Sequence, residues 1–284
     1  MTDNAELIKL VERMPAFPQG VTKVLELTAR ADCAPKELVK VIEHDPVITM
    51  KILKLVNSAF YGLSRPINSI NHGVVFVGIN TIKNLALTIA AIGMLPKRNG
   101  AGFDMNKFLM HSLGVAGINK RLASILGVPD RDAADYFIAG LLHDFGKVVL
   151  AQYKAEEFRQ ALELAAEGGM SLAEAELQVL GVDHAEIGAL LAENWTLPMD
   201  LVQCIRYHHQ PEVELENGKM RDAVFAANLV VHSVPFGDSG NHLIGDFPPS
   251  IQQRFGCDLN GMLMMESLGD LDEEMKKASA FMTL

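Results

Sequence analysis

Side chains that bind metals recur along the middle of this chain. Five histidines and one aspartate could act as ligands: His111, the pair His143-Asp144, His184 and the pair His208-His209. Imidazole nitrogens suit transition metals, whereas Mg and Ca prefer oxygen ligands. A bound transition metal can activate water for attack on a phosphoester. The set therefore predicts one centre with one or two divalent ions, Fe, Zn, Ni or Mn, with partial occupancy or an empty site as the alternatives.

Each of these residues also has an ordinary structural explanation. A single histidine on an apolar helix face is commonly a hydrogen-bonded core residue. The pair His208-His209 alone could end a helix, where the partial negative charge of the helix favours imidazolium. Several such histidines within about 120 residues favour metal ligation over separate structural roles. The metal site is therefore our preferred interpretation of the whole set.

The remaining histidines are not part of this candidate ligand set. The dipeptide His44-Asp45 also reads His-Asp, but Asp45 directly precedes Pro46. An aspartate followed by proline is typical of a helix start, so we interpret this pair as structural. The histidines that we assign to the surface or to loops are His72, His232 and His242.

The candidate ligands lie on segments with helical periodicity. His111 shares a spacing of three, four and seven residues with Phe108, Val115 and Ile118, which places it on a buried stripe. We expect His143 and Asp144 on one continuous helix, where Gly140 and Gly146 leave room for another backbone or a ligand. His184 should begin a helix capped by Asp183, and His208-His209 should end another.

Helical periodicity extends over almost the whole chain. Asp45 and Pro46 should start a helix whose buried face carries either Val47 and Met50 or Ile48 and Ile52, together with Leu55 in both cases. Thr81 should cap a helix that carries Ile82, Leu85, Ile89 and Ile92. No run shows the two-residue alternation of a half-buried strand. The fold class is therefore all-α.

Size and charge restrict the kinds of partner. The 284 residues carry a formal net charge of −10, which disfavours non-specific binding to DNA. The N-terminus does not resemble a secretory signal, and the apolar stretch around Leu85 to Leu95 is too short to span a membrane. The three cysteines are far apart and form no CxxC pair, which is typical of a reduced, cytoplasmic protein. We expect a cytoplasmic protein that binds neither DNA nor membranes.

Two polar, turn-rich connectors suggest a division of the chain. The first is Pro96–Asp104, and the longest is Pro235–Ser250. We predict an N-terminal helical lobe over residues 1–100, a lobe with the metal-ligand set over 101–235, and a C-terminal loop and helical tail over 236–284.

Several motifs in order resemble the HDOD (HD-related output domain) family, within the HD and HD-GYP superfamily of metal-dependent phosphohydrolases. The N-terminal motifs are "MPAFPQGVTKVLEL", "VIEHDPVITMKILKLVNSAFYG" and "INSINHGVVFVGINTIKNL". The later ones are "HSLGVA", "GLLHDFGK", "HAEIGALLAENWTLP" and "HHQPE". The resemblance covers Leu10 to Pro235 and implies an HD-domain-like helical bundle.

The resemblance implies roles for individual residues. The implied metal-ligand positions are His111, His143, Asp144, His184, His208, His209 and Asn228. Asp144 and Lys147 would be the catalytic residues, with Lys147 contacting phosphate. Asn228 stands where the superfamily has its final aspartate, so the amide brings neither charge nor basicity. The Gly-Tyr-Pro element after the double histidine is absent, and Lys107 stands where some HD-GYP sites have an acidic residue.

These departures favour binding over hydrolysis. Our leading hypothesis is a regulatory, signal-transducing protein that acts through signalling protein partners encoded elsewhere. The alternative is a phosphohydrolase that cleaves a nucleotide or cyclic dinucleotide despite Asn228. A third possibility is a module that binds such a nucleotide without cleaving it.

Overall fold

The computed structural model describes residues 4–28, 33–243, 245–263, 268–271, 273 and 279–283, and within these ranges every regular element is helical. The all-α prediction is confirmed. The helices are α1 (Asn4–Val11), α2 (Gln19–Thr28), α3 (Pro35–Glu43), α4 (Pro46–Val56), α5 (Ile70–Val77), α6 (Ile79–Gly93), α7 (Met105–Ile125), α8 (Asp130–Leu142), α9 (Gly146–Tyr153), α10 (Ala155–Ala166), α11 (Leu172–Leu180), α12 (His184–Asn194), α13 (Met199–Tyr207), α14 (Lys219–His232), α15 (Pro249–Phe255), α16 (Leu259–Leu263) and the 3-10 helix η2 (Ser279–Thr283).

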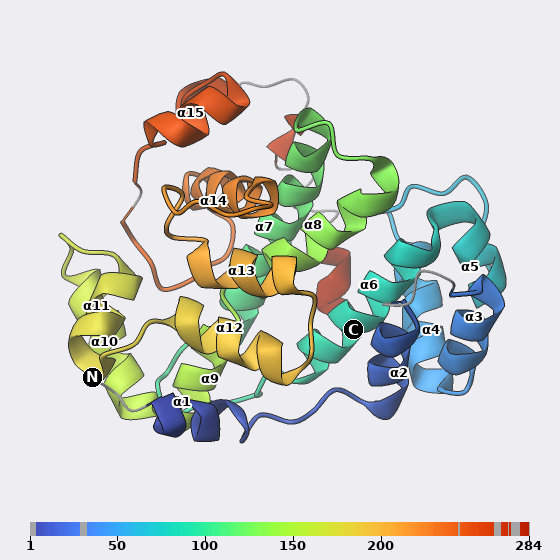
Figure 1. Cartoon of the computed structure of the whole chain (residues 1–284), viewed down its shortest axis with the longest axis horizontal. Coiled ribbons are helices and arrows are strands. Elements are labelled where there is room, and N and C mark those ends of the chain that lie inside the picture. The colour runs from blue at the N-terminus through green and yellow to red at the C-terminus, as the bar shows by residue number, and fades with distance from the viewer. Residues whose placement is uncertain are drawn as a thin grey trace.

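Helices α2 to α5 gather on one side of the molecule, where α2, α4 and α5 pack against α6 and α3 packs against those three helices (Figure 1). The Asp45 carboxylate caps α4 by accepting hydrogen bonds from the backbone of the first turn, as predicted. Of the two expected faces, Ile48 and Ile52 are buried, whereas Val47 and Met50 are exposed. Helix α1 packs instead against α9 and α12. The predicted lobe boundaries remain a proposal.

The expected cap at Thr81 is wrong. Helix α6 begins at Ile79, and its N-cap is Gly78, three residues before Thr81. Gly78 has a φ of 85°, which glycine adopts without steric cost. The backbone therefore turns sharply between α5 and α6, and the hydroxyl of Thr81 is not needed to start the helix.

The middle of the molecule is a bundle in which the long α7 packs along α8 and α14, while α9 and α13 both pack against α12. Two glycines permit close contacts there, as the sequence predicted. A Cβ at Gly140 would lie 2.7 Å from Ala116 Cα on α7. A Cβ at Gly146 would lie 2.0 Å from the carbonyl oxygen of His184. These clashes explain why both positions require glycine.

The predicted continuous helix through His143 and Asp144 is wrong. Helix α8 ends at Leu142 with His143 as its C-cap, and α9 begins at Gly146. The backbone N–H of His143 still bonds to Ala139 O at 3.0 Å, but the next residues form turns. The break places the two side chains at a junction between helices, close to the N-terminus of α12.

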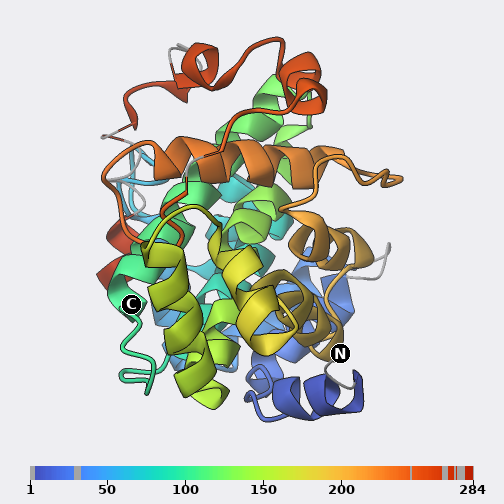
Figure 2. The same cartoon turned by 90° about the vertical axis from the view of Figure 1, so that its left-hand side faces the viewer.

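After α14 the chain crosses back over the bundle without regular structure (Figure 2). Residues 235–243, here called the strap, lie between α14 and α15. The strap is held to α7, because Asp238 N donates to Lys107 O at 3.0 Å. Of the expected C-terminal loop and tail over 236–284, residues 244, 264–267, 272, 274–278 and 284 lie outside the described residues.

No single helix among the described residues is long and apolar enough to cross a membrane.

Candidate metal centre

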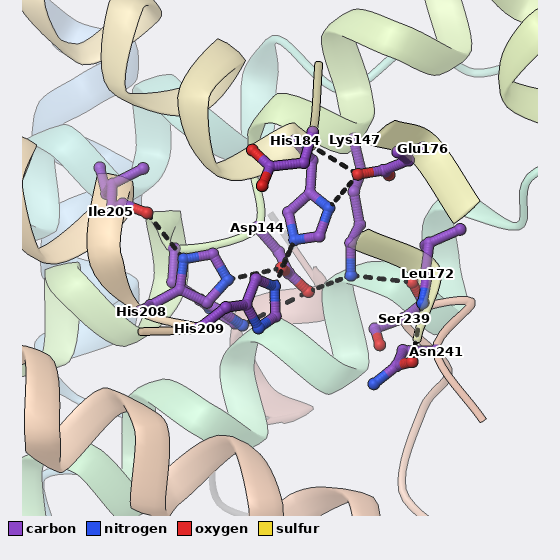
Figure 3. A network of polar contacts seen from close by, with 12 residues as sticks. Asp144, Lys147, Leu172, Glu176, His184, Ile205, His208, His209, Ser239 and Asn241 are labelled. Carbon is purple, nitrogen blue, oxygen red and sulfur yellow. Dashed lines mark hydrogen bonds and ion pairs between the residues drawn. The ribbon is translucent and has the colours of Figure 1, made fainter. Parts of the chain in front are cut away.

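One carboxylate lies at the centre of the predicted ligand set. Asp144 is fully buried, and its Oδ1 lies 3.0 Å from His184 Nε2 and 3.5 Å from His208 Nε2. His209 joins this side, because its Nε2 lies 2.9 Å from His184 Nε2. Figure 3 shows these imidazoles directed at the carboxylate from α12 and from the end of α13. Asp144, His184, His208 and His209 form a group with metal-ligand spacing, here called the His184 group.

The second carboxylate oxygen faces another set of side chains. Asp144 Oδ2 lies 3.3 Å from His143 Nε2 and 3.9 Å from His111 Nε2. These three residues form a second group with metal-ligand spacing, here called the His111 group. Asp144 belongs to both groups and offers a different oxygen to each. The structure therefore brings together all six of the histidine and aspartate positions that the sequence singled out.

Backbone carbonyls fix the orientation of two rings. His143 Nδ1 donates to Gly140 O at 2.8 Å, and His208 Nδ1 donates to Ile205 O at 2.7 Å. Since a carbonyl only accepts, each Nδ1 carries a proton, and each Nε2 is the ring nitrogen directed toward Asp144 and available to a metal. Such a bond on the far nitrogen is the usual way in which proteins orient metal-binding histidines.

Several inward-facing atoms in this cluster are buried without a hydrogen-bond partner. They are Nε2 of His111, His143 and His208, together with Oδ1 of Asp144 and Oε1 of Glu176. The amide Oδ1 of Asn228 on α14 is buried without a partner as well. Buried polar atoms normally have partners, because an unsatisfied one costs roughly 1–3 kcal/mol. Lone pairs on imidazole nitrogens beside a carboxylate are what a transition metal would satisfy. The residues present therefore fit a divalent transition metal.

Glu176 is a site residue that the sequence analysis missed. Its side chain on α11 is fully buried, and its Oε2 accepts hydrogen bonds from His184 Nδ1 at 2.6 Å and from His184 N at 2.7 Å. This carboxylate orients the His184 ring toward Asp144. A signal was available, because Glu176 interrupts the apolar face of its helix only eight residues before His184.

Lys147 contacts the candidate ligands directly. Its Nζ lies 2.7 Å from Asp144 Oδ2 and donates to the carbonyl oxygen of Ser239 in the strap at 3.1 Å. Its side chain is almost fully buried, so the ammonium depends on these two acceptors. Figure 3 shows the strap residues Ser239 and Asn241 beside this lysine. Whether Lys147 contacts phosphate stays a prediction.

The assignment of His232 to the surface or to a loop is wrong. His232 is the last residue of α14, is only partly exposed, and lies one turn after Asn228 on the same helix. Its ring centroid is 4.7 Å from that of His111.

Asn228 is buried on α14, but its role as a metal ligand stays a prediction. His72 and His242 are exposed, as expected.

A cavity of about 280 Å³ opens beside the His111 group. Its wall includes His111 and His232 together with residues of the strap such as Phe236 and Asp238. A Cβ at Gly237 would lie only 2.3 Å from the backbone nitrogen of His111, so the strap runs directly against α7. A small ligand in this cavity would therefore lie next to a candidate metal ligand.

Burial and neighbouring charges shift the titration of the cluster in opposite directions. Burial alone would raise the pKa of Asp144, but His143, Lys147 and His184 hold this pKa well below its usual range. Burial also lowers the pKa of His208 to about 4. For His184 burial acts in the same direction, but Glu176 and Asp144 outweigh it and raise the pKa to about 9.

Sequence and fold together define a helical protein with a buried histidine-aspartate cluster. The family model of the HDOD domain matches residues 14–211, and the chain belongs to this family. The match contains every member of both ligand groups, and it ends before Asn228, His232 and the strap.

Solved structures share this fold. An HDOD domain protein of unknown function from Geobacter sulfurreducens is 25% identical, with a TM-score of 0.79 over 99% of this chain and 100% of that chain. A candidate phosphohydrolase from Shewanella amazonensis SB2B is 24% identical, with a TM-score of 0.74 over 98% of each chain. These likenesses confirm the prediction of a helical bundle of the HDOD type.

An uncharacterized protein from Treponema pallidum (strain Nichols) is 28% identical over 236 residues. The aligned region is 80% of this chain but 44% of that protein. The chain thus spans less than half the length of this curated relative.

Proposed function

We propose that this chain is a cytoplasmic regulatory HDOD protein that holds a divalent transition metal and transmits a signal. It acts mainly by binding a signalling protein partner, or a nucleotide such as a cyclic dinucleotide. The metal is Fe, Zn, Ni or Mn, with one or two ions at the cluster around Asp144.

The single observation that supports binding of a ligand over catalytic turnover is that both ligand groups depend on one carboxylate, that of Asp144. It is the only carboxylate in either ligand group, and its Oδ2 already contacts Lys147 Nζ at 2.7 Å. Two divalent ions sharing this one negative charge would repel each other with little neutralisation, in a buried site where charges are weakly screened. Asn228 adds an amide oxygen but no charge. The site thus favours retention of a metal over activation of water by a closely spaced pair.

The alternative function is hydrolysis of a phosphoester, and the cavity beside His111 is the observation that favours it. A metal bound at this cluster would supply Lewis acidity and an activated water. Within the chain, Lys147 could neutralise charge on a phosphate, and Asp144 could hold the ligand set in place. The strap would exclude bulk water from one side.

A phosphodiesterase assay separates the two functions. Protein loaded with Mn, Fe, Zn or Ni is tested on a generic phosphodiester and on cyclic dinucleotides, beside a His143→Ala variant. Regulatory function predicts no activity above buffer in either protein. Activity that is present in the wild type and lost in the variant would establish the hydrolase. Calorimetry with the same cyclic dinucleotides then tests for binding without cleavage.

A further inference from the structure

The two ligand groups around Asp144 are unequal. The His184 group has four members, Asp144 and three histidines, whereas the His111 group has only His111, His143 and Asp144. Transition metals such as Zn in proteins usually take four ligands when the site is structural. The His111 group therefore needs a further ligand if it is to hold an ion with protein atoms alone.

Helix α14 carries two polar side chains that could supply this ligand, and one of them, His232, lies beside His111. Asn228 has a buried Oδ1 without a partner, and His232 follows it by four residues, on the same face of the helix. The His232 ring is tilted by 42° against the His111 ring, at a centroid separation of 4.7 Å. His111 and His143 are themselves 5.8 Å apart by ring centroids. The His111 ring thus has both the His143 ring and the His232 ring as neighbours.

The present contact of His232 is weak. Its Nε2 lies 3.4 Å from Ser239 Oγ, beyond the usual range for a good hydrogen bond. Turning this ring from the strap toward His111 would therefore break little. His232 also lines the cavity beside His111, which leaves open space on one side of it. The His143 ring cannot turn in this way, because it is fully buried and its Nδ1 donates a hydrogen bond to Gly140 O.

We propose that His232 is an additional metal ligand, which completes the His111 group with a third imidazole. This inference rests on the proposed metal site and deepens it. Three imidazoles and one carboxylate form a donor set suited to Zn, Fe or Co. The neutral imidazole is the better donor of the two candidates on α14, because the amide of Asn228 is a weak ligand for these metals.

Metal affinity measured by competition with a chelator tests the proposal, with Co²⁺ as the probe because its visible spectrum also reports the number of ligands. His232→Ala should weaken Co²⁺ binding at least about tenfold and change the spectrum. His242→Ala, which removes another histidine from the wall of the same cavity, should change neither. Circular dichroism in excess chelator checks that the variants fold alike.

A double-mutant cycle guards against an indirect effect of His232→Ala. Asn228→Asp supplies a carboxylate one turn from His232 and should make the imidazole dispensable. His232→Ala should therefore cost much less affinity in the Asn228→Asp background than in the wild type. An equal cost in both backgrounds would show that His232 acts through the fold, and would overturn the proposal.

Failure of the metal site itself has a different signature. If the wild type binds no more Co²⁺ than Asp144→Ala, which lacks the ligand shared by both groups, the proposed metal site is wrong and so is the role of His232. If Asp144→Ala loses the metal while His232→Ala and His242→Ala both match the wild type, the metal site stands and only the role of His232 is wrong.

Discussion

Glu176 Oε2 accepts a hydrogen bond of 2.6 Å from Nδ1 of His184, whose Nε2 lies 3.0 Å from Asp144. One imidazole therefore connects a carboxylate outside the ligand groups with the carboxylate at their centre. Such an outer carboxylate fixes the ring and raises its basicity as a ligand.

Replacing this outer carboxylate should weaken the metal site. Glu176→Gln removes the charge but nearly keeps the shape, and we expect a loss in metal affinity of about 10- to 100-fold. Competition with a chelator measures it. The matched control is Glu174→Gln on the same helix, because Glu174 is exposed and glutamine also serves in a capping box. Equal affinities of the two variants would contradict the role of Glu176.

Removing the lysine should make stability depend on metal. Lys147→Met leaves Asp144 without its ammonium partner, and breaking a buried ion pair costs about 3–5 kcal/mol. A divalent ion would replace the missing positive charge, so added Zn²⁺ should raise the Tm of this variant more than that of the wild type. Thermal unfolding with and without metal measures the difference.

The control for this prediction is Lys154→Met. Lys154 pairs with Glu6 at the surface, at a distance of 3.0 Å. Exposed ion pairs contribute at most about 1 kcal/mol. A Lys147→Met protein with the same Tm as this control, and with no greater rise in Tm on adding Zn²⁺, would disprove the claim that a divalent ion can replace the Lys147 ammonium beside Asp144.

Metal-free protein should lose stability in mild acid. Burial lowers the pKa of His208 from 6.5 to about 4, so the unfolded chain takes up a proton at a higher pH than the folded one. The stability contributed by the neutral ring is present above pH 6.5 and is lost as the pH falls toward 4. This residue alone accounts for up to about 3 kcal/mol.

His184 does not cancel this loss. Its raised pKa of about 9 keeps the folded ring charged at both pH 7 and pH 5. Its stabilising contribution therefore changes only as the unfolded chain finishes protonating near pH 6.5, which is a smaller change than the loss from His208. Urea unfolding in the presence of chelator at pH 7 and pH 5 measures the effect. A midpoint that stays the same or rises at pH 5 would show that the cluster is already protonated when folded.

The strap should be sensitive to one methyl group. Gly237 has a φ of 75°, and a Cβ there would lie 2.3 Å from the backbone nitrogen of His111. We expect Gly237→Ala to destabilise the protein by at least about 1–3 kcal/mol and to weaken metal binding through His111. Gly245→Ala is the control, because a Cβ at Gly245 meets nothing within 4 Å. Unfolding midpoints that match would contradict the close packing of the strap on α7.

The sequence predicted the parts of the site that depend on helical periodicity. His111 lies on a buried stripe, and the cap of Asp183 sets the start of α12 at His184. Helix spacing and cap chemistry are local properties, so a single chain reveals them. The same is true of Gly140 and Gly146, whose missing side chains indicated close contacts.

The remaining features depend on contacts between distant segments. His232 joins the cluster only because α14 packs beside it, and no local sequence pattern predicts this packing. Glu176 interrupts an apolar helix face, but its contact with His184 depends on how α11 packs against α12. The bond from Lys147 to Ser239 spans 92 residues and depends on the path of a loop. The break after Leu142 was also missed, because the junction with α12 overrides a helical pattern that continues across it.

The central claim is that the cluster around Asp144 holds a transition metal. Elemental analysis of the chain purified without added metal tests it most directly, with Asp144→Ala, which removes the ligand shared by both groups, purified in parallel. We predict bound Fe, Zn, Ni or Mn in the wild type and its loss in the variant. A wild-type protein without such a metal, which also fails to take one up on dialysis against these ions, would contradict the account.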